Sequence, residues 1–240
     1  MSHYLVTYAT HAHGMYDNLK TKFPNIVVGG WGTTWTGFMD KFNFMIEFLN
    51  KLNADDIVIF VDGFDTIING NVEEAVLRFK EEFVDCKVVV SYGTIEEYLH
   101  PYIKNKMFGT FKTVANSGLY MGYAHELKEL LTKATKTNHM NDDQRALNLA
   151  MKDCNFNICI DYKNRIFQNL SHKERKITDY NKLDAIFLQC NGEFQFNMTS
   201  IKKWIGIFAK FLPEVLGILI IIIIILNINR KTRFMHTYNK

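Results

Sequence analysis

The sequence predicts an α/β fold in which helices flank a mixed, mostly parallel sheet, followed by one C-terminal transmembrane helix. Short β-rich segments alternate with longer amphipathic ones, as in folds whose parallel strands are joined by helical crossovers. Residues 57–61 are continuously apolar, which is typical of a central strand buried on both faces. Residues 204–226 form an apolar segment long enough to cross a bilayer, for which about 20 residues are needed.

The first half of the chain alternates regularly between strand and helix patterns. A helix at 39–52 is expected because its apolar residues recur at the spacing of one helical face. A helix beginning at Val72 is expected because Asn71 can cap its N-terminus and Glu73 and Glu74 lie in its first turn. In chain order, the expected elements are strand 4–9, helix 17–23, strand 25–28, helix 39–52, strand 57–61 and helix 72–83.

The second half continues this alternation and becomes irregular toward its end. Residues 114–123, VANSGLYMGY, combine small polar residues with glycines and indicate a tight turn into a strand. Residues 171–203 lose clear periodicity and are expected to form a closing loop and a linker. The remaining expected elements are strand 87–91, helices 125–135 and 142–152, and strands 158–160 and 165–167.

Charge and cysteine usage exclude two classes of function. Lys and Arg total 28 against 25 Asp and Glu, so the formal net charge is +3. This balance is too mild for a nucleic-acid-binding protein, and no basic stripe with interleaved aromatics is present. The four cysteines form no CxxC pair and have no matching histidine pair, which argues against a zinc site. Their spacing favours a reducing compartment.

The apolar segment near the C-terminus predicts a single-pass membrane anchor. Lys210, Pro213 and Glu214 interrupt its first half, whereas six consecutive isoleucines at 220–225 favour lipid over the alternative of a buried core segment. The N-terminus does not resemble a signal peptide, so a cytosolic placement of the N-terminal domain is expected, with a lumenal one left open. The expected organisation is a domain at 1–195, a linker at 196–203, a transmembrane helix at 204–228 and a short basic tail at 229–240.

Two aspartates, Asp62 and Asp65, stand at the end of the apolar strand in the stretch FVDGFD. Ligands of open α/β sheets bind beyond the carboxyl ends of the strands. Two carboxylates on a tight turn can converge there on one hard divalent cation, Mg²⁺ or Mn²⁺. Such a cation could bridge the phosphates of a nucleotide and neutralise a leaving diphosphate. The alternative, a pair of turn-capping aspartates, stays open from the motif alone.

Two further polar clusters lie later in the chain. Asp142, Asp143 and Gln144 in MNDDQ offer carboxylates and an amide, although Asn and Asp also open helices routinely. The segment 116–118, Asn-Ser-Gly, would let the backbone approach a ligand closely, and its alternative is an ordinary tight turn.

Four short motifs follow one another in a specific order across residues 4–192. They are FVDGFD at 60–65, NSGLYMGYA at 116–124, NDDQ at 141–144 and IDYKNRIFQNL at 160–170. In this order and spacing they resemble the glycosyltransferase domain of procollagen lysyl hydroxylases. The loop GGWG, followed by Lys41, resembles the donor loop of the same family. The resemblance implies a GT-A fold, a Rossmann-like sheet whose strand-end aspartates bind Mn²⁺ and a UDP-sugar such as UDP-glucose or UDP-galactose.

The resemblance also implies a role for each motif. Asp62 and Asp65 would bind the metal, Lys41 would face the donor diphosphate, and Trp31 would lie near the nucleotide or sugar. The sugar pocket would be shaped by Asn116, Ser117 and Gly118, with Asp161 and Phe167 supporting it from behind. The acceptor or the transferred sugar would be faced by Asp142, Asp143 and Gln144.

One position departs from the family pattern. The family completes its metal shell with a late histidine, and the matching segment here, LQCNGEF at 188–194, has Gln189 in its place. Glutamine offers a neutral oxygen that hard cations accept. Metal binding by Asp62, Asp65 and Gln189 is therefore still expected, but it should be weaker than with the family's histidine.

Three functional hypotheses follow. The first is a membrane-anchored glycosyltransferase that moves a hexose from a UDP-sugar to a hydroxyl of a protein or glycan, such as hydroxylysine or a sugar on it. The second, motivated by Gln189, is a weakened or inactive relative that binds a nucleotide sugar or a partner. The third, a membrane protein whose soluble part only packs, does not explain acidic clusters at strand ends.

Overall fold

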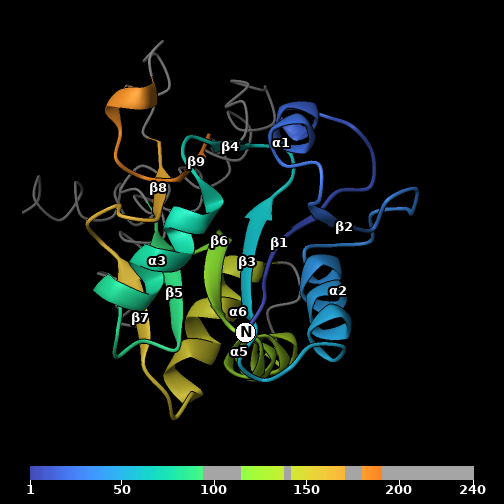
Figure 1. The fold of residues 1–240 in the computed structure, drawn as a ribbon. Helices are drawn as coiled ribbons and strands as arrows, with labels where there is room; N and C mark the ends of the chain where they lie inside the picture. Colours follow the sequence, from blue (N-terminus) through green and yellow to red (C-terminus); the bar gives the residue numbers. More distant parts are fainter. Residues whose placement is uncertain (94–114, 138–141, 171–179, 191–240) are drawn as a thin grey trace, which may run out of the picture. The chain divides into compact units, whose positions relative to one another are not determined.

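The computed structural model describes residues 1–93, 115–137, 142–170 and 180–190, all within one compact unit that spans Met1–Gly192. These residues form a six-stranded sheet, a three-stranded sheet and helices on both faces of the larger sheet (Figure 1). The predicted α/β class is therefore confirmed.

The larger sheet is mixed and mostly parallel, in the strand order β2-β1-β3-β6-β5-β7. Parallel pairs join β1 with β2 and β3, and β5 with β7, while β6 runs antiparallel to both of its neighbours. The carboxyl ends of β1 and β3 therefore meet at one edge of the sheet. The strands are β1 (His3–Tyr8), β2 (Val27–Gly29), β3 (Ile57–Asp62), β5 (Val88–Tyr92), β6 (Ala115–Tyr123) and β7 (Ile158–Asp161).

Two layers of helices bury the apolar strands from opposite sides. Every residue of β3 from Ile57 to Val61 is fully buried, as its continuous apolar run predicts for a strand covered on both faces. Helices α2 (Met39–Leu49), α5 (Ala124–Thr135) and α6 (Asp143–Ala150) share one core with Phe60 and Tyr120. Helices α1 (Tyr16–Lys22) and α3 (Val72–Glu82) share the opposite core with Ile59.

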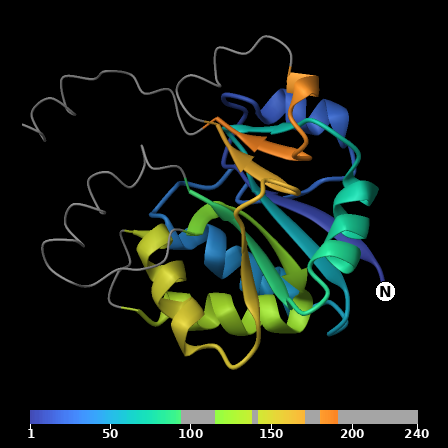
Figure 2. The ribbon, with the colours of Figure 1, turned by 90° about the vertical axis from the view of Figure 1, so that its left-hand side faces the viewer.

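The smaller sheet lies at one end of the larger one, next to the carboxyl end of β3 (Figure 2). It is built from three three-residue strands, β4 (Thr66–Ile68), β9 (Phe187–Gln189) and β8 (Phe167–Asn169), in that order. Its apolar row of Ile68, Phe187 and Phe167 packs into the core that α3 covers. The strands β4 and β9 were not predicted from the sequence. The prediction of a loop and linker over 171–203 is wrong at Phe187–Gln189, which form β9.

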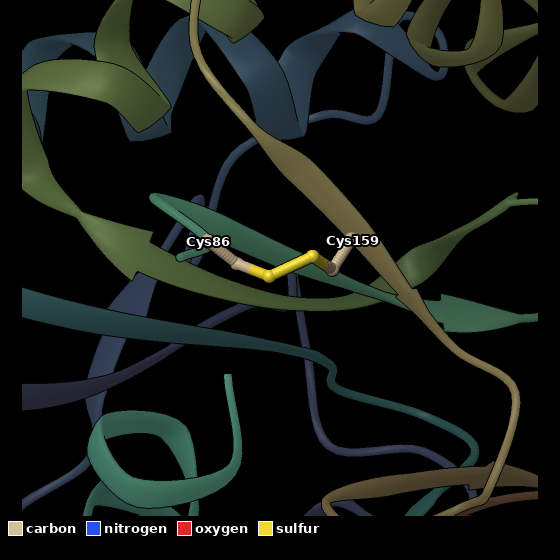
Figure 3. The surroundings of a disulfide bond; sticks show 2 residues. All are labelled: Cys86 and Cys159. Atoms are coloured by element: carbon tan, nitrogen blue, oxygen red, sulfur yellow. A yellow bond between two sulfur atoms is a disulfide. The ribbon is translucent and has the colours of Figure 1, made fainter. Parts of the chain in front are cut away.

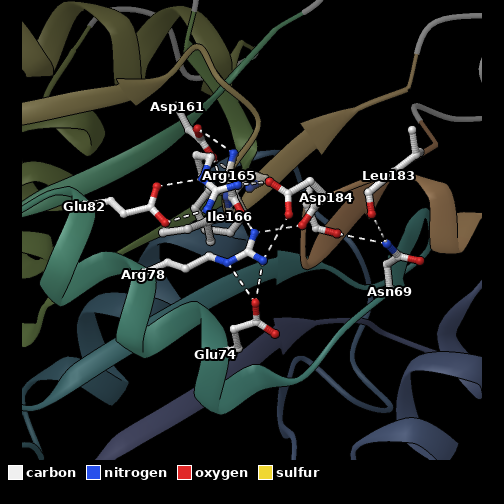
Figure 4. Close-up of polar contacts among 11 residues, drawn as sticks. Asn69, Glu74, Arg78, Glu82, Asp161, Arg165, Ile166, Leu183 and Asp184 are labelled. Atoms are coloured by element: carbon white, nitrogen blue, oxygen red, sulfur yellow. Dashed lines mark hydrogen bonds and ion pairs between the residues drawn. The ribbon is translucent and has the colours of Figure 1, made fainter.

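A polar network fixes the smaller sheet to α3 and β7 (Figure 4). Buried Asp161 at the end of β7 accepts backbone hydrogen bonds from residues 165–167 at 2.7 to 2.9 Å, which shapes the turn into β8. Arg78 of α3 donates to the carbonyls of Arg165 and Asp184, and Arg165 pairs with Glu82 and Asp184. Asp161 and Phe167 thus support the smaller sheet, and their role behind a sugar pocket stays a prediction.

A disulfide joins Cys86, just before β5, to Cys159 of the neighbouring strand β7 (Figure 3). The two cysteines are 73 residues apart in the sequence, and their Cα atoms are 5.8 Å apart. Sequence spacing gave no sign of this pairing, because the two cysteines approach only after β7 pairs beside β5 in the sheet. The reducing compartment inferred from the cysteine spacing does not agree with this bond.

The predicted membrane span at 204–228 lies outside the described residues. Within the ranges that are described, no helix combines the length and apolar character needed to cross a bilayer.

The Cys86–Cys159 bond makes a prediction about chemistry and stability. Unfolded protein that has not been reduced should show two fewer reactive thiols than the same protein after reduction. Reduction should lower the free energy of unfolding by about 2–4 kcal/mol, because the open chain gains conformational freedom. Thiol titration and urea denaturation measure the two effects. Equal thiol counts before and after reduction would contradict the bond.

Candidate active site

The two strand-end aspartates converge on one side chain from the smaller sheet. The amide Nε2 of Gln189 lies 3.1 Å from Asp62 Oδ2 and 3.3 Å from both carboxylate oxygens of Asp65. Asp62 ends β3, Gly63 turns the chain, and β4 then pairs with β9, which carries Gln189. The three residues implied as metal ligands are thus brought together by the contact between the two sheets.

A bulge in β6 makes room for this convergence. Val90 of β5 pairs with Tyr120 and Tyr92 pairs with Ala115, so four residues of β6 stand opposite Ser91 alone. The bulge contains Asn116, whose Oδ1 accepts a 2.6 Å hydrogen bond from the Gly118 amide.

Glycine at position 118 is required by the space around it. A Cβ there would lie 2.3 Å from Gln189 Nε2 and 2.5 Å from Asp62 Oδ2. The absent side chain at Gly118 therefore permits the contact between Gln189 and Asp62.

The buried Lys41 of α2 bridges the partly exposed carboxylates of Asp62 and Asp143. Its Nζ lies 3.3 Å from Asp62 Oδ1 and 2.6 Å from Asp143 Oδ2. Asp143 Oδ2 also accepts a 2.6 Å hydrogen bond from the hydroxyl of Ser117 in the β6 bulge. Lys41 therefore joins the aspartate pair to the motifs at 116–118 and 142–144.

Burial and charge shift these groups in different directions. Burial alone would lower the pKa of Lys41, but the carboxylates of Asp62 and Asp143 raise it above its ordinary value. Burial raises the pKa of Asp62; the Lys41 ammonium opposes this shift, and the Asp143 charge adds to it. Burial would also raise the pKa of Asp143, but the charge and hydrogen bond of Lys41 hold it below its ordinary value. The Lys41 ammonium thus offsets burial at Asp143 but not at Asp62.

The chemistry of these residues fits a hard divalent cation. Among the described residues, no group of three or more His, Cys, Asp or Glu side chains could hold a metal, so two carboxylates need a further ligand of another type. Gln189 can supply it, because its Oε1 is buried and makes no hydrogen bond within the described part of the protein. Two carboxylates and one amide oxygen are the ligand types that Mg²⁺ and Mn²⁺ accept.

The other predicted site residues make contacts outside this cluster, two of them hydrogen bonds within α6. Asp142 is the N-cap of α6, accepting a 2.9 Å hydrogen bond from the Arg145 amide, as its helix-capping alternative proposed. The carbonyl of Gln144 accepts from Asn148 in the same helix. Trp31 is 53% exposed and stacks on Tyr16 with 4.9 Å between ring centroids.

Two residues near the cluster were missed from the sequence. Thr66 stands directly opposite Gln189 in the β4–β9 pair. Tyr120 has a buried hydroxyl, and burial raises its pKa, with the charges of Asp62 and Asp143 adding to the shift. No sequence pattern singles out Tyr120, whereas Thr66 directly follows the second aspartate and could have been found by its position.

A match to a family model gives the class of this fold and site. Residues 7–193 match a model described as the PLOD GT domain, a glycosyltransferase domain. The match covers most of the chain and includes every residue of the cluster around Lys41 and Gln189. The chain belongs to this family of PLOD GT domains.

Curated and solved proteins provide more distant matches. The Caenorhabditis elegans multifunctional procollagen lysine hydroxylase and glycosyltransferase is 26% identical over 174 residues, which cover 65% of this chain. The matched part is 23% of that protein, so this chain corresponds to about a quarter of its length.

Similar solved structures include a glycosyltransferase involved in glycosylation of the major capsid of PBCV-1 and mouse xyloside xylosyltransferase 1. Their TM-scores are 0.49 and 0.48, with 8% and 9% sequence identity. Each alignment covers 80% of this chain, with 94% of the first protein and 98% of the second. No functional inference follows at this level of similarity.

The Lys41 bridge predicts a pH-dependent loss of stability. Lys41→Met leaves the carboxylates of Asp62 and Asp143 without their counter-ion and should cost about 3 kcal/mol at pH 7, the lower end for a buried pair because Asp62 keeps some exposure. The lowered pKa of Asp143 and the raised pKa of Lys41 mean that the bridge stabilises the fold between about pH 4 and pH 10. The deficit should therefore shrink as pH falls and the carboxylates of the variant take up protons.

Urea denaturation at pH 7 and pH 4 measures this change. Lys51→Met, at an exposed lysine after α2, is the matched control and should differ little from wild type at either pH. A deficit for Lys41→Met that is equal at both pH values would contradict the bridge.

Proposed function

We propose that this protein is a glycosyltransferase that moves a hexose, glucose or galactose, from a UDP-sugar to a hydroxyl acceptor with a divalent cation, Mn²⁺ or Mg²⁺. The observation that carries the proposal is the convergence of Asp62, Asp65, Gln189 and Lys41 beyond the carboxyl end of β3. Carboxylates and an ammonium side by side suit a ligand that carries both a cation and phosphates. Hydroxylysine, or a sugar already attached to it, is the proposed acceptor class.

The proposed roles follow from charge and reach. Asp62, Asp65 and the Gln189 amide oxygen would hold the cation, which neutralises the donor diphosphate when bound. Lys41 is buried and already paired with two carboxylates. Its ammonium would also donate a hydrogen bond to a phosphate oxygen of the donor. Ser117 and Asp143 share a hydrogen bond beside Lys41 and would contact the hydroxyls of the transferred sugar or the acceptor. Trp31, half exposed near Tyr16, would contact the nucleotide.

A second candidate function rests on Gln189. A neutral amide adds no negative charge to the aspartate pair, so it binds a cation less strongly than a charged ligand would. The protein would then bind a UDP-sugar as a membrane-attached module with little or no turnover.

The test is a panel of UDP-sugars with the full chain, with and without Mn²⁺, measuring UDP release and transfer to hydroxylysine-containing peptides. Asp65→Ala should abolish UDP release, because it removes a proposed ligand of the cation that neutralises the diphosphate. Asp55→Ala, at an exposed aspartate before β3, is the matched control and should retain wild-type activity. Turnover by Asp65→Ala at the wild-type rate would overturn the metal role. Binding of UDP without any turnover by wild type would favour the binding module.

Membrane attachment through residues 204–228 is part of the proposal, and the supporting observation is the isoleucine-rich run at 220–225. The Cys86–Cys159 bond supports an oxidising compartment for the folded domain, in place of the cytosolic placement expected from the N-terminus. Alkaline carbonate extraction of cell membranes tests the attachment. The full chain should stay with the membrane pellet, and its release into the supernatant would contradict the anchor.

A further inference from the structure

An aromatic pair lies at the carboxyl ends of β5 and β7. Tyr92 is the last residue of β5, and Tyr162 directly follows β7. Their ring centroids are 5.1 Å apart, with 49° between the ring planes. Tyr162 is 63% exposed, so a large part of its side chain is open to solvent. Neither tyrosine belongs to the cluster around Lys41 and Gln189.

The pair stands at the same edge of the larger sheet as the proposed cation site. Because β6 is antiparallel to both β3 and β5, those two strands run in the same direction, and β7 is parallel to β5. The carboxyl ends of β3, β5 and β7 therefore share one edge. Neighbouring strands are about 4.8 Å apart, so β5 lies about 10 Å and β7 about 14 Å from β3, which ends in Asp62.

The Tyr92 side chain lies on the side of the sheet that α6 covers. Ser91, the residue before it, faces the other side, because Asn169 of the smaller sheet reaches its hydroxyl at 3.4 Å. Successive side chains of a strand point to opposite faces, so Tyr92 shares the face of β5 that packs against α5 and α6. Helix α6 is fixed beside the pair, because Asn148 exchanges two hydrogen bonds with the backbone of Ala115, which stands directly opposite Tyr92.

The backbone around the pair is held in place. The Tyr92 carbonyl accepts a 2.6 Å hydrogen bond from Asn169 Nδ2. On the other strand, buried Asp161 accepts hydrogen bonds from the backbone amides of residues 165–167, which closes the turn that contains Tyr162. A contact surface whose backbone is already fixed loses little conformational freedom when a ligand binds, and this favours affinity.

We propose that Tyr92 and Tyr162 form a subsite for a sugar ring of the acceptor, an inference that rests on the proposed transferase function. In that function Trp31, which follows the edge strand β2, contacts the nucleotide, so the donor occupies the β1–β2 side of the cation site. The acceptor is then expected on the other side, toward β5 and β7. Asp143 hydrogen-bonds Ser117 on β6, the strand between β3 and β5, and therefore lies between the cation site and the pair.

The chemistry of the pair suits a sugar ring. The C–H face of a hexose is apolar and packs on an aromatic ring, while the sugar hydroxyls stay available at its edge. Tyrosine combines a large apolar ring with a hydroxyl at its tip, so it can supply both kinds of contact. The pair would therefore raise the affinity for an acceptor that carries a sugar ring next to its reacting hydroxyl.

Binding is measured first without any donor, so that the result does not depend on turnover. The full chain, in a detergent that carries no sugar, is titrated with methyl β-galactoside and methyl β-glucoside, and binding is detected by saturation-transfer NMR. Tyr162→Ala should weaken binding about 10-fold, because it removes the exposed ring. Tyr162→Phe keeps the ring and should stay within about 2-fold of wild type. Leu77→Ala, at an exposed residue of α3, is the matched control and should bind like wild type.

A kinetic measurement separates the acceptor from the donor. With a peptide whose hydroxylysine carries a hexose, Tyr162→Ala should raise KM for the peptide about 10-fold and KM for the UDP-sugar less than about 2-fold. An equal rise for the same peptide without the hexose would show that the ring contacts the peptide, and the sugar subsite would be wrong.

The remaining outcomes distinguish the subsite from the transferase. Wild type that binds neither glycoside, or Tyr162→Ala with wild-type binding and KM, would overturn the subsite, and UDP-sugar turnover by the same protein would leave the transferase standing. Glycoside binding that needs Tyr162, without turnover of any UDP-sugar, would retain the sugar site and reject the transferase. Tyr162→Ala should unfold at the wild-type urea concentration, and a lowered midpoint would attribute its weaker binding to structural damage and overturn the inference.

Discussion

The partly exposed carboxylate of Asp62 is the group around which the described residues are organised. It ends β3, whose other residues are all fully buried, and a charge that is largely withdrawn from water is costly unless partners surround it. Lys41 approaches it from one helix layer and Gln189 from the smaller sheet, while Gly118 leaves the space for the Gln189 contact. Helix packing, the bulge in β6 and the pairing of β4 with β9 each help to place a partner beside this carboxylate.

The sequence predicted the framework better than the contacts. Hydrophobic patterning placed most long helices and the strands of the larger sheet within a few residues, because their periodicity follows directly from burial. The resemblance carried by several weak motifs assigned Asp62, Asp65, Lys41 and Gln189 to one region, and the structure brings these four together. The strand propensity of the local sequence carried little information about β4 and β9, since strands of three residues are stabilised by partner strands far away in the chain.

Contacts between distant segments explain the remaining differences. Asp142 caps α6, while the neighbouring Asp143 faces Lys41. Which of two adjacent aspartates caps the helix and which reaches the lysine cannot be predicted from their residue type. The disulfide depends on the register of β5 and β7, and Thr66 becomes relevant only after β9 pairs beside it. Each of these features requires knowing which strand lies next to which, and local sequence does not contain that information.

The Cys86–Cys159 bond closes a loop of the chain that contains some residues of the cluster and leaves the others outside. The closed ring of chain between the cysteines contains Ser117, Gly118 and Asp143, whereas Lys41, Asp62, Asp65 and Gln189 belong to the segments outside it. When the chain opens locally, the ring keeps its members near one another, but the outside segments separate freely. The half of the cluster that contains both strand-end aspartates is therefore held to the other half by non-covalent packing alone.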